Sequence, residues 1–129
     1  MNACFVDTNI FIEIFTRFGK KSDSCKTLLD TGNNLVTTSL VVSEVEWVLR
    51  SFYELPKKDV VRCLGKILML DIDIDHKKIL LQVLAFYEEH IVDWTDCLNM
   101  FLMKDQDVSD VYSYDKGLNK FGWIKRLEP

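Results

Sequence analysis

The sequence is poor in the residues that mark fibrous, disordered or metal-clustering chains. Among its 129 residues there are only 5 glycines and 2 prolines, while 48% are hydrophobic, a composition typical of a globular fold. The 4 cysteines form no Cys-x-x-Cys pair, and the 2 histidines form no ligand cluster with them. We therefore expect the cysteines to act as small apolar residues in a reducing compartment, and we expect no zinc site.

Long apolar segments and an excess of positive charge are also lacking. No apolar run reaches the roughly 18 residues of a membrane span, and the N-terminus lacks the pattern of a signal peptide. We therefore expect a cytoplasmic protein with no membrane partner. The net charge is −4, from 16 Lys+Arg against 20 Asp+Glu. Because proteins that bind nucleic acid mainly through phosphates are usually basic, this chain would need another attractant, such as a bound divalent cation.

Helical and strand-like segments alternate along the chain. This order predicts a layered α/β fold with a mostly parallel sheet, and the length of 129 residues fits a single domain over residues 1–129. Strands are expected at 3–7, 35–38, 69–73, 110–114 and 123–127. Helices are expected at 9–18, 22–32 (with Ser22 as its cap), 40–53, 56–68, 76–90 and 94–105.

Two aspartates stand where strand-like segments end. Asp7 closes the apolar run 3–6, and Asp115 closes the run VYSY. Ligands of an open parallel sheet bind beyond the carboxyl ends of its strands, so both carboxylates would face one crevice if the strands run in the same direction. The alternatives are that Asp7 or Thr8 caps the following helix, and that Asp115 is an ordinary turn residue.

Glu44 lies on the strongly amphipathic segment 40–53. The apolar stripe of this segment contains Val41, Val45, Val48, Leu49 and Phe52. At about 100° per residue, Glu44 lies roughly 70° from the centre of the stripe and Glu46 roughly 130° away. We therefore expect Glu46 to face water and Glu44 to lie at the border of the buried face. There Glu44 either extends its stem over apolar surface or has a partner.

The stretch VDWTDCLNM begins a largely apolar helix with two aspartates. Asp93 is expected as the N-cap and Asp96 as the third helical residue, and acidic residues in a first turn favour the helix dipole. Capping would account for both. However, Asp96 shares its helical face with Met100 and Met103, and a carboxylate on an apolar face needs a counter-charge. This placement favours a functional role for Asp96.

The carboxylates of Asp7, Glu44, Asp96 and Asp115 would form a metal site if the fold brought them together. Each close pair would repel by about 4 kcal/mol at an effective dielectric constant of about 20, and a cation would offset this repulsion. Oxygen ligands without His or Cys suit Mg²⁺ or Mn²⁺. Such an ion would attract phosphate despite the negative net charge and would lower the pKa of a bound water, which fits phosphodiester hydrolysis.

Four stretches, in order along nearly the whole chain, resemble the PIN-domain family of metal-dependent ribonucleases. Within that family the chain resembles the VapC-type toxins of toxin–antitoxin pairs. The stretches are FVDTNIFIEIF, TTSLVVSEVEWVL, VDWTDCLNM and VYSYDKGLNKFGWIKRLEP. The resemblance implies an α/β/α sandwich around a mostly parallel sheet of four or five strands. It also implies a homodimer and a cognate antitoxin that occupies a groove beside the active site.

The resemblance also implies the roles of individual residues by position. Asp7 and Asp96 match the aspartates that hold Mg²⁺ or Mn²⁺. Glu44 and Asp115 match the other acidic residues, which complete the site directly or through water. The nearby polar residues that support the site are Thr8, Asn9 and Ser113.

Three functions remain open at this stage. The first is a metal-dependent endoribonuclease, the toxin of a toxin–antitoxin pair. The second is a catalytically idle PIN-like module that serves as an RNA-processing scaffold or a protein-interaction domain; retention of all four acidic residues argues against it. The third, a magnesium phosphatase or receiver-like domain, is disfavoured because Asp7 is followed by Thr8 and Asn9 rather than by a second acid. Leu118 and Asn119 stand where many family members carry Phe and Asp, so a fifth acidic ligand is not supported.

Overall fold

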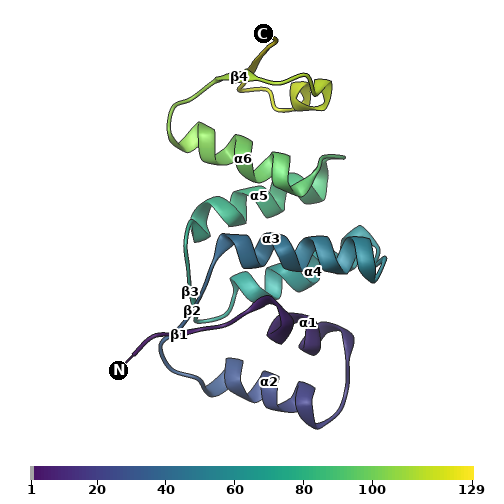
Figure 1. Cartoon of the computed structure of the whole chain (residues 1–129), viewed down its shortest axis with the longest axis vertical. Helices are drawn as coiled ribbons and strands as arrows, with labels where there is room; N and C mark the ends of the chain where they lie inside the picture. The colour runs from purple at the N-terminus through teal and green to yellow at the C-terminus, as the bar shows by residue number, and fades with distance from the viewer. Residues whose placement is uncertain (1) are drawn as a thin grey trace. The chain divides into compact units, whose positions relative to one another are not determined.

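The structure is a computed structural model that describes residues 2–129. The chain forms two compact units, one ending at Lys77 and the other running from Lys78 to Pro129. Both units combine helices with parallel strands, which confirms the α/β class expected from the sequence. The helices and most of the strands are labelled in chain order in Figure 1. A single domain over residues 1–129 stays a prediction.

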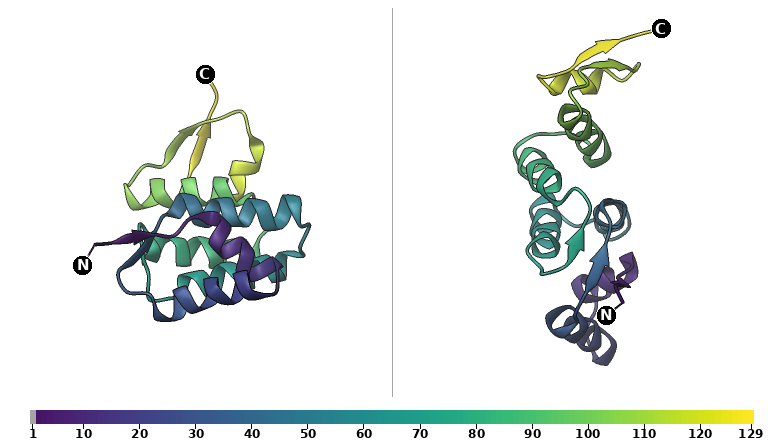
Figure 2. Two further views of the ribbon diagram at one scale, coloured as in Figure 1. Left: turned by 60° about the horizontal axis from the view of Figure 1, so that its bottom comes forward. Right: turned by 90° about the vertical axis from the view of Figure 1, so that its left-hand side faces the viewer.

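The first unit alternates strands and helices. Its elements are β1 (Cys4–Phe5), α1 (Thr8–Thr16), α2 (Lys20–Thr31), β2 (Leu35–Thr37), α3 (Ser39–Trp47), the π-helical η1 (Val48–Phe52), α4 (Lys57–Leu68) and β3 (Asp73–Ile74). The three strands form a parallel sheet in the order β1-β2-β3, with Cys4 opposite Leu35 and Val36 opposite Asp73. Helix α1 contacts α2 and α3, and α3 contacts α4, as can be followed in Figure 2.

The second unit contains two helices followed by a strand pair. Its elements are α5 (Lys77–Glu89), α6 (Trp94–Asp105), β4 (Asp110–Tyr112), the 3₁₀ helix η2 (Lys116–Lys120) and β5 (Lys125–Leu127). β4 and β5 are parallel, with Val111 opposite Arg126. Because these strands are parallel, the intervening residues 113–124, which include η2, form the crossover that such a pair requires. The two helices of the unit are in contact, since the Cys97 thiol on α6 lies 3.8 Å from the Val83 carbonyl of α5.

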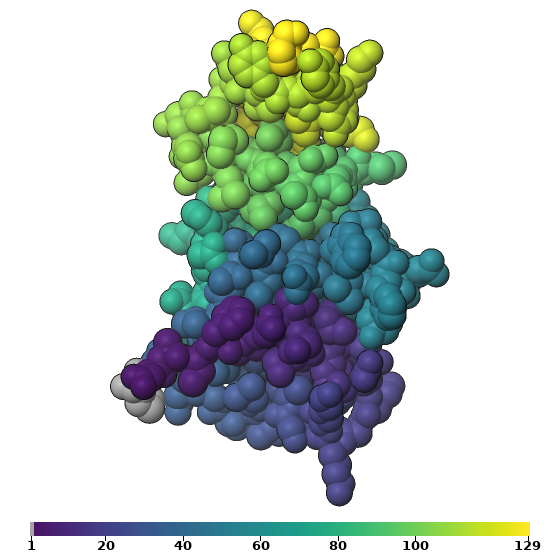
Figure 3. Space-filling model, viewed as in Figure 1, coloured from purple at the N-terminus to yellow at the C-terminus, as the bar shows by residue number. Residues whose placement is uncertain are grey.

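The hydrophobic core begins directly after β1. Both residues of β1 are exposed, Phe5 to 57%, because this edge strand pairs only with β2. Figure 3 shows the purple N-terminal residues on the surface of the first unit. Val6 and Phe11, by contrast, are almost fully buried. Asp7 thus directly follows Val6, the first buried residue among residues 2–129.

Helix α6 is buried on most of its faces, as its sequence predicts. Its buried residues are Trp94, Cys97, Leu98, Met100 and Phe101. Its bounds, 94–105, coincide with the predicted helix. Three of the four cysteines are buried, as expected for small apolar residues, and none forms a disulfide within residues 2–129. None of the helices described here has both the length and the apolar content that a membrane crossing requires.

The predicted capping role of Ser22 is wrong. Helix α2 begins at Lys20, with Gly19 as its N-cap at φ 116°. This backbone conformation is easily reached only by glycine, so the turn between α1 and α2 starts the helix earlier than the sequence pattern suggests. Ser22 is instead fully buried, and its hydroxyl donates a hydrogen bond of 2.7 Å to the Glu13 carboxylate on α1.

The predicted strand 69–73 is also displaced. Helix α4 extends to Leu68, and the Met69 N–H still donates to the Gly65 carbonyl at 3.1 Å, so the helix end occupies the first part of this stretch. The strand β3 forms later, at Asp73–Ile74. The other predicted strands contain observed strands of two or three residues. Within residues 2–129 the five strands are divided between a sheet of three and a pair.

Candidate metal centre

Asp7 is placed by the end of the first sheet. The preceding residue is fixed on both sides: the Val6 N–H donates to Val36 and the Thr37 hydroxyl donates to the Val6 carbonyl, both at 2.8 Å. Asp7 is exposed and is the N-cap of α1, where its Oδ1 accepts the Thr8 N–H at 2.7 Å. The capping interpretation is therefore correct, and it uses only one of the two carboxylate oxygens.

The two predicted supporting residues after Asp7 differ in their surroundings. Thr8 is buried, and its Oγ1 has no hydrogen-bond partner among the residues that the structure describes. Asn9 is exposed. A buried hydroxyl without a hydrogen-bond partner lowers the free energy of unfolding by about 1–3 kcal/mol, so stability alone does not explain a threonine at position 8.

Glu44 is exposed, so its predicted place at the border of the buried face is wrong. The helix that carries it is firmly started. Thr38 caps α3 by accepting the Val41 N–H at 3.1 Å, and the Asp75 carboxylate accepts both the N–H and the hydroxyl of Ser39 at 2.7 Å. Glu44 therefore projects into solvent from the second turn of a well-anchored helix that follows β2 directly in the chain.

Glu46, which was expected to face water, is only 1% exposed. The Arg50 guanidinium reaches back along the helix, and its Nε lies 2.6 Å from Glu46 Oε2. The error arises because both α1 and α4 pack against α3, so its buried face is wider than one stripe. In addition, the helix continues as the π-helical η1, where 100° per residue no longer holds and Phe52 is 73% exposed.

Asp96 lies in a pocket of the second unit. As predicted, Asp93 is the N-cap of α6, and its carboxylate accepts the Asp96 N–H at 3.0 Å. The Asp96 side chain itself is half-buried and accepts no hydrogen bond from the described part of the chain. The pocket has a volume of about 240 Å³ and is lined by Ile91, Val92, Asp93, Asp96, Gly117, Lys120 and Phe121. Its one lysine is anchored, because Lys120 Nζ donates to the Ile91 carbonyl at 2.7 Å.

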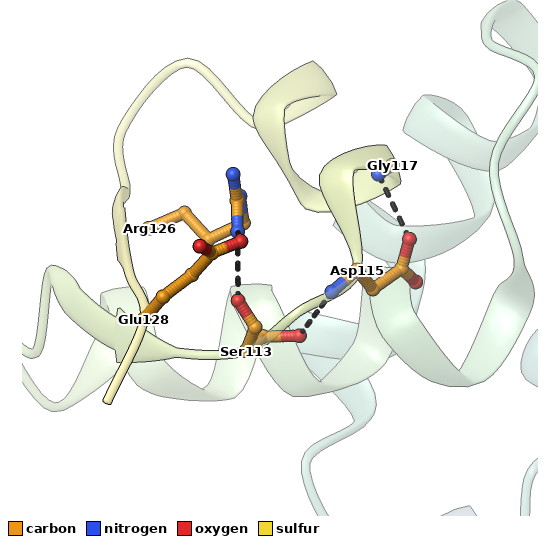
Figure 4. Close-up of polar contacts among 5 residues, drawn as sticks. All are labelled: Ser113, Asp115, Gly117, Arg126 and Glu128. Carbon is orange, nitrogen blue, oxygen red and sulfur yellow. Dashed lines mark hydrogen bonds and ion pairs between the residues drawn. The ribbon is translucent and has the colours of Figure 1, made fainter.

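Asp115 lies on the crossover between β4 and β5, where β4 ends. It is the N-cap of η2, and its Oδ1 accepts the Gly117 N–H at 2.8 Å, so the turn interpretation is correct. The Asp115 N–H in turn donates to the Ser113 hydroxyl at 3.0 Å. A Cβ atom at position 117 would lie 3.0 Å from Asp115 Oδ1, so glycine allows this close approach. These contacts are drawn in Figure 4.

The electrostatics of the second unit centre on Asp96. Burial raises the pKa of the Asp96 carboxyl, and the negative charges of Asp93 and Asp115 raise it further. The charges of Asp93 and Asp115 therefore both disfavour the ionised form of Asp96, which accepts no hydrogen bond among the residues described. A divalent cation beside Asp96 would relieve this repulsion, and an all-oxygen set of donors fits Mg²⁺ or Mn²⁺.

The predicted residues are thus divided between the two units. Asp7, Thr8, Asn9 and Glu44 belong to the first unit, and Asp96, Ser113 and Asp115 to the second. The structure brings Asp96 and Asp115 within electrostatic reach of each other. Taken separately, neither unit presents a group of three or more His, Cys, Asp or Glu that could hold a metal ion, for residues 2–129. The four-carboxylate set therefore stays a prediction.

Sequence reasoning missed one partly buried charge in the second unit. Arg126, on β5, belongs to the quoted stretch GWIKRLEP, which predicts only an edge strand. Its side chain is 14% exposed and donates from Nη1 to the Ser113 carbonyl at 2.8 Å. The alternation in this segment, with the exposed Lys125 next to Arg126, gives no clear sequence signal for its burial.

The fold and these carboxylates define an α/β protein that carries acidic residues beyond the ends of its parallel strands. The family model described as "PIN domain" matches residues 4–124, and the chain therefore belongs to the PIN-domain family. This confirms the family resemblance and the fold class drawn from the sequence. The matched range includes all four predicted acidic residues.

Among solved structures, the chain is similar to the VapC20 toxin of Mycobacterium tuberculosis, described as a Sarcin-Ricin loop cleaving toxin. The two share 16% sequence identity, with 93% of this chain and 95% of that chain covered, and a TM-score of 0.44. At that TM-score the likeness carries no argument. No curated protein sequence matches the chain.

Proposed function

We propose that the protein is an endoribonuclease that hydrolyses RNA phosphodiester bonds with the help of Mg²⁺ or Mn²⁺. The observation that carries the proposal is the state of Asp96, a half-buried carboxylate in a pocket that also contains Asp93, with no hydrogen-bond donor among the described residues and with a pKa raised by burial and by the charges of Asp93 and Asp115. Such an arrangement is unfavourable without a cation. Membership of the PIN-domain family supports the same activity, since the chain's acidic motifs resemble those of metal-dependent ribonucleases.

In this proposal Asp7 and Asp96 hold the metal ion, and Glu44 and Asp115 complete its surroundings directly or through water. A bound ion supplies a water of lowered pKa and offsets charge on the leaving oxygen. The protein holds the carboxylates of the site in position. Asp7 keeps one oxygen available while the other caps α1, and Asp115 is oriented by the Gly117 N–H. Thr8, Asn9 and Ser113 support these carboxylates.

The proposal extends to the biological role, which rests on the sequence motifs shared with VapC-type toxins. On this basis the enzyme is a cytoplasmic homodimer whose activity is blocked by a cognate antitoxin. Light scattering of the purified protein, alone and after co-expression with the product of an adjacent small gene, tests both parts of this statement. A monomer that neither dimerises nor retains a small partner would contradict them.

A catalytically idle module is the second candidate. It is favoured by one observation: within each unit, over the described residues, no group of three or more metal-ligating side chains is present. Such a module would bind RNA or protein without cleaving it. RNA digestion separates the two candidates directly, because only the enzyme releases shorter fragments in a reaction that EDTA stops.

The test compares total cellular RNA digested by the wild type and by Asp7→Asn, with Mn²⁺ or with EDTA. Asparagine caps helices about as well as aspartate, so this variant keeps the fold and removes only the charge. We expect Mn²⁺-dependent cleavage by the wild type and its loss in the variant. Asp110→Asn, at an exposed acidic residue of β4, serves as the control and should cleave normally. Undiminished cleavage by folded Asp7→Asn would overturn the assignment.

A further inference from the structure

Arg126 connects β5 to the segment that bears Asp115. Its Nη1 donates to the Ser113 carbonyl at 2.8 Å and to Glu128 Oε1 at 2.8 Å. Figure 4 shows the contact between Arg126 and Ser113. The Ser113 peptide is held from its other side as well, because its N–H donates to the Leu127 carbonyl at 3.0 Å. Both hydrogen-bonding groups of the Ser113 backbone are thus fixed by β5.

A continuous series of hydrogen bonds leads from this fixed peptide to the Asp115 carboxylate. The Ser113 hydroxyl accepts the Asp115 N–H at 3.0 Å, and Asp115 Oδ1 accepts the Gly117 N–H at 2.8 Å. Asp115 Oδ2 accepts no hydrogen bond from the residues described. The guanidinium therefore sets the place of Ser113, Ser113 sets the backbone of Asp115, and one carboxylate oxygen stays available for a ligand.

Stability alone does not account for Arg126. Its ion pair with Glu128 is a weak one, because the Glu128 side chain is 49% exposed and surface pairs contribute about 0–1 kcal/mol. Its Nε is buried without a hydrogen-bond partner among the described residues, which costs about 1–3 kcal/mol. An apolar side chain at position 126 would fill the same space without the cost of the buried Nε. We therefore attribute the presence of arginine to its contact with Ser113.

We propose that Arg126 is a positioning residue for the Asp115 carboxylate and thereby sets the affinity of the site for its divalent cation. This inference rests on the proposed function. Residues that orient metal ligands from behind change metal affinity about 10–100-fold when they are removed. In this inference Arg126 acts through Ser113, with which it makes its contact.

The test uses Arg126→Met and Arg126→Lys in the full chain, with Glu128→Gln as the matched control. The control removes the other partner of the same guanidinium and leaves the Ser113 contact in place. Two quantities are measured: the Mn²⁺ concentration that gives half of the maximal thermal stabilisation, and the Mn²⁺ concentration for half-maximal RNA cleavage. Melts in EDTA establish that each variant is folded.

We expect both Mn²⁺ concentrations to rise about tenfold in Arg126→Met, with the KM for RNA unchanged. Arg126→Lys keeps a donor for the Ser113 carbonyl and should recover part of the loss, and Glu128→Gln should match the wild type.

A folded Arg126→Met with the Mn²⁺ dependence of the control would overturn the inference, even if its kcat were lower. If Arg126→Met does not fold, a wild-type Mn²⁺ dependence in Arg126→Lys and in Ser113→Ala overturns it. A wild type that neither cleaves RNA nor responds to Mn²⁺ would instead refute the proposed function, and the inference with it.

Discussion

Replacing Asp96 with asparagine should stabilise the metal-free protein and abolish its response to Mn²⁺. The substitution should act in opposite directions without and with metal, because of the groups that surround the Asp96 side chain. Without metal, the charge is half-buried, lacks hydrogen-bond donors and faces Asp93 and Asp115, so its removal relieves repulsion. With metal, the same charge is a ligand. An ordinary structural aspartate would show neither effect.

The magnitude is limited by solvent, because Asp96 is only half-buried. Screened charge pairs of this kind contribute about 0.2–1 kcal/mol, so the free energy of unfolding in EDTA should rise by about 0.5–1 kcal/mol. For a chain of this size that corresponds to about 2–4 °C in Tm. Asparagine has nearly the same volume as aspartate and cannot contact more of the core, so the gain is electrostatic.

The pH dependence provides an independent check on the sign. The native-state pKa of Asp96 is raised above its ordinary value of 3.8, so the native state binds the proton more tightly than the unfolded chain. The contribution of Asp96 to stability therefore falls as the pH rises from 3.8 through the raised value, and the full penalty is present above it. In Asp96→Asn this contribution is absent, so its advantage over the wild type should shrink as the solution is acidified.

Thermal melts in EDTA and in millimolar Mn²⁺ measure these effects, with Asp105→Asn as the control on the same helix. Asp105 is exposed at the end of α6 and should keep the full Mn²⁺ shift when replaced. A lower Tm for Asp96→Asn in EDTA would refute the claim of repulsion. A Mn²⁺ shift as large as that of the wild type would refute the role as a ligand.

Two further predictions concern the anchoring of helix α3. Arg50→Ala should lower the free energy of unfolding in urea melts by about 3 kcal/mol, because it removes the arginine cation from the buried Glu46 carboxylate. Glu46→Gln should lower it by only about 1 kcal/mol, because the 44% exposed Arg50 side chain can turn to water. Equal losses in the two variants would contradict this asymmetry. Burial raises the pKa of Asp75, but hydrogen bonds from Ser39 outweigh it and lower the pKa overall. The Asp75 carboxylate therefore stabilises the fold at pH values above its ordinary pKa of 3.8, and this contribution is lost as the pH falls through the lowered pKa. Asp75→Asn should accordingly lose less stability between neutral and acid pH than the wild type. Parallel pH profiles of stability would contradict this.

The parts of the fold that the sequence predicts well are those with local signals. Helix α6 has the predicted bounds because Asp93 caps it and a long apolar run follows. The family and the α/β class, which depend on the order of such segments, are confirmed. The start of α2 was misplaced because it depends on the positive φ of Gly19, and β3 was misplaced because the N–H groups of Met69 and Leu70 still bond to the last turn of α4.

The candidate site shows a different limit. Capping by Asp7, Asp93 and Asp115 could be read from the sequence, because a cap acts within a few residues. The exposure of Glu44 and the burial of Glu46 could not, because they depend on the packing of α1 and α4 against α3 and on a π-helical segment. Whether the four acids share a metal ion stays a prediction that the Mn²⁺ experiments address.

The parallel pairing of β4 and β5 has a practical consequence. Two strands so close in sequence are usually joined by a tight hairpin, but here the chain must travel back along the full length of β4 before it can pair. The connecting stretch is fixed at Lys120 and Trp123, which donate to the Ile91 and Met100 carbonyls, but its start at Ser113 is held by the three residues of β5. A protease cut or a fusion partner that detaches those three residues would release the Ser113 peptide, and with it the backbone of Asp115, while every acidic side chain remained in the chain.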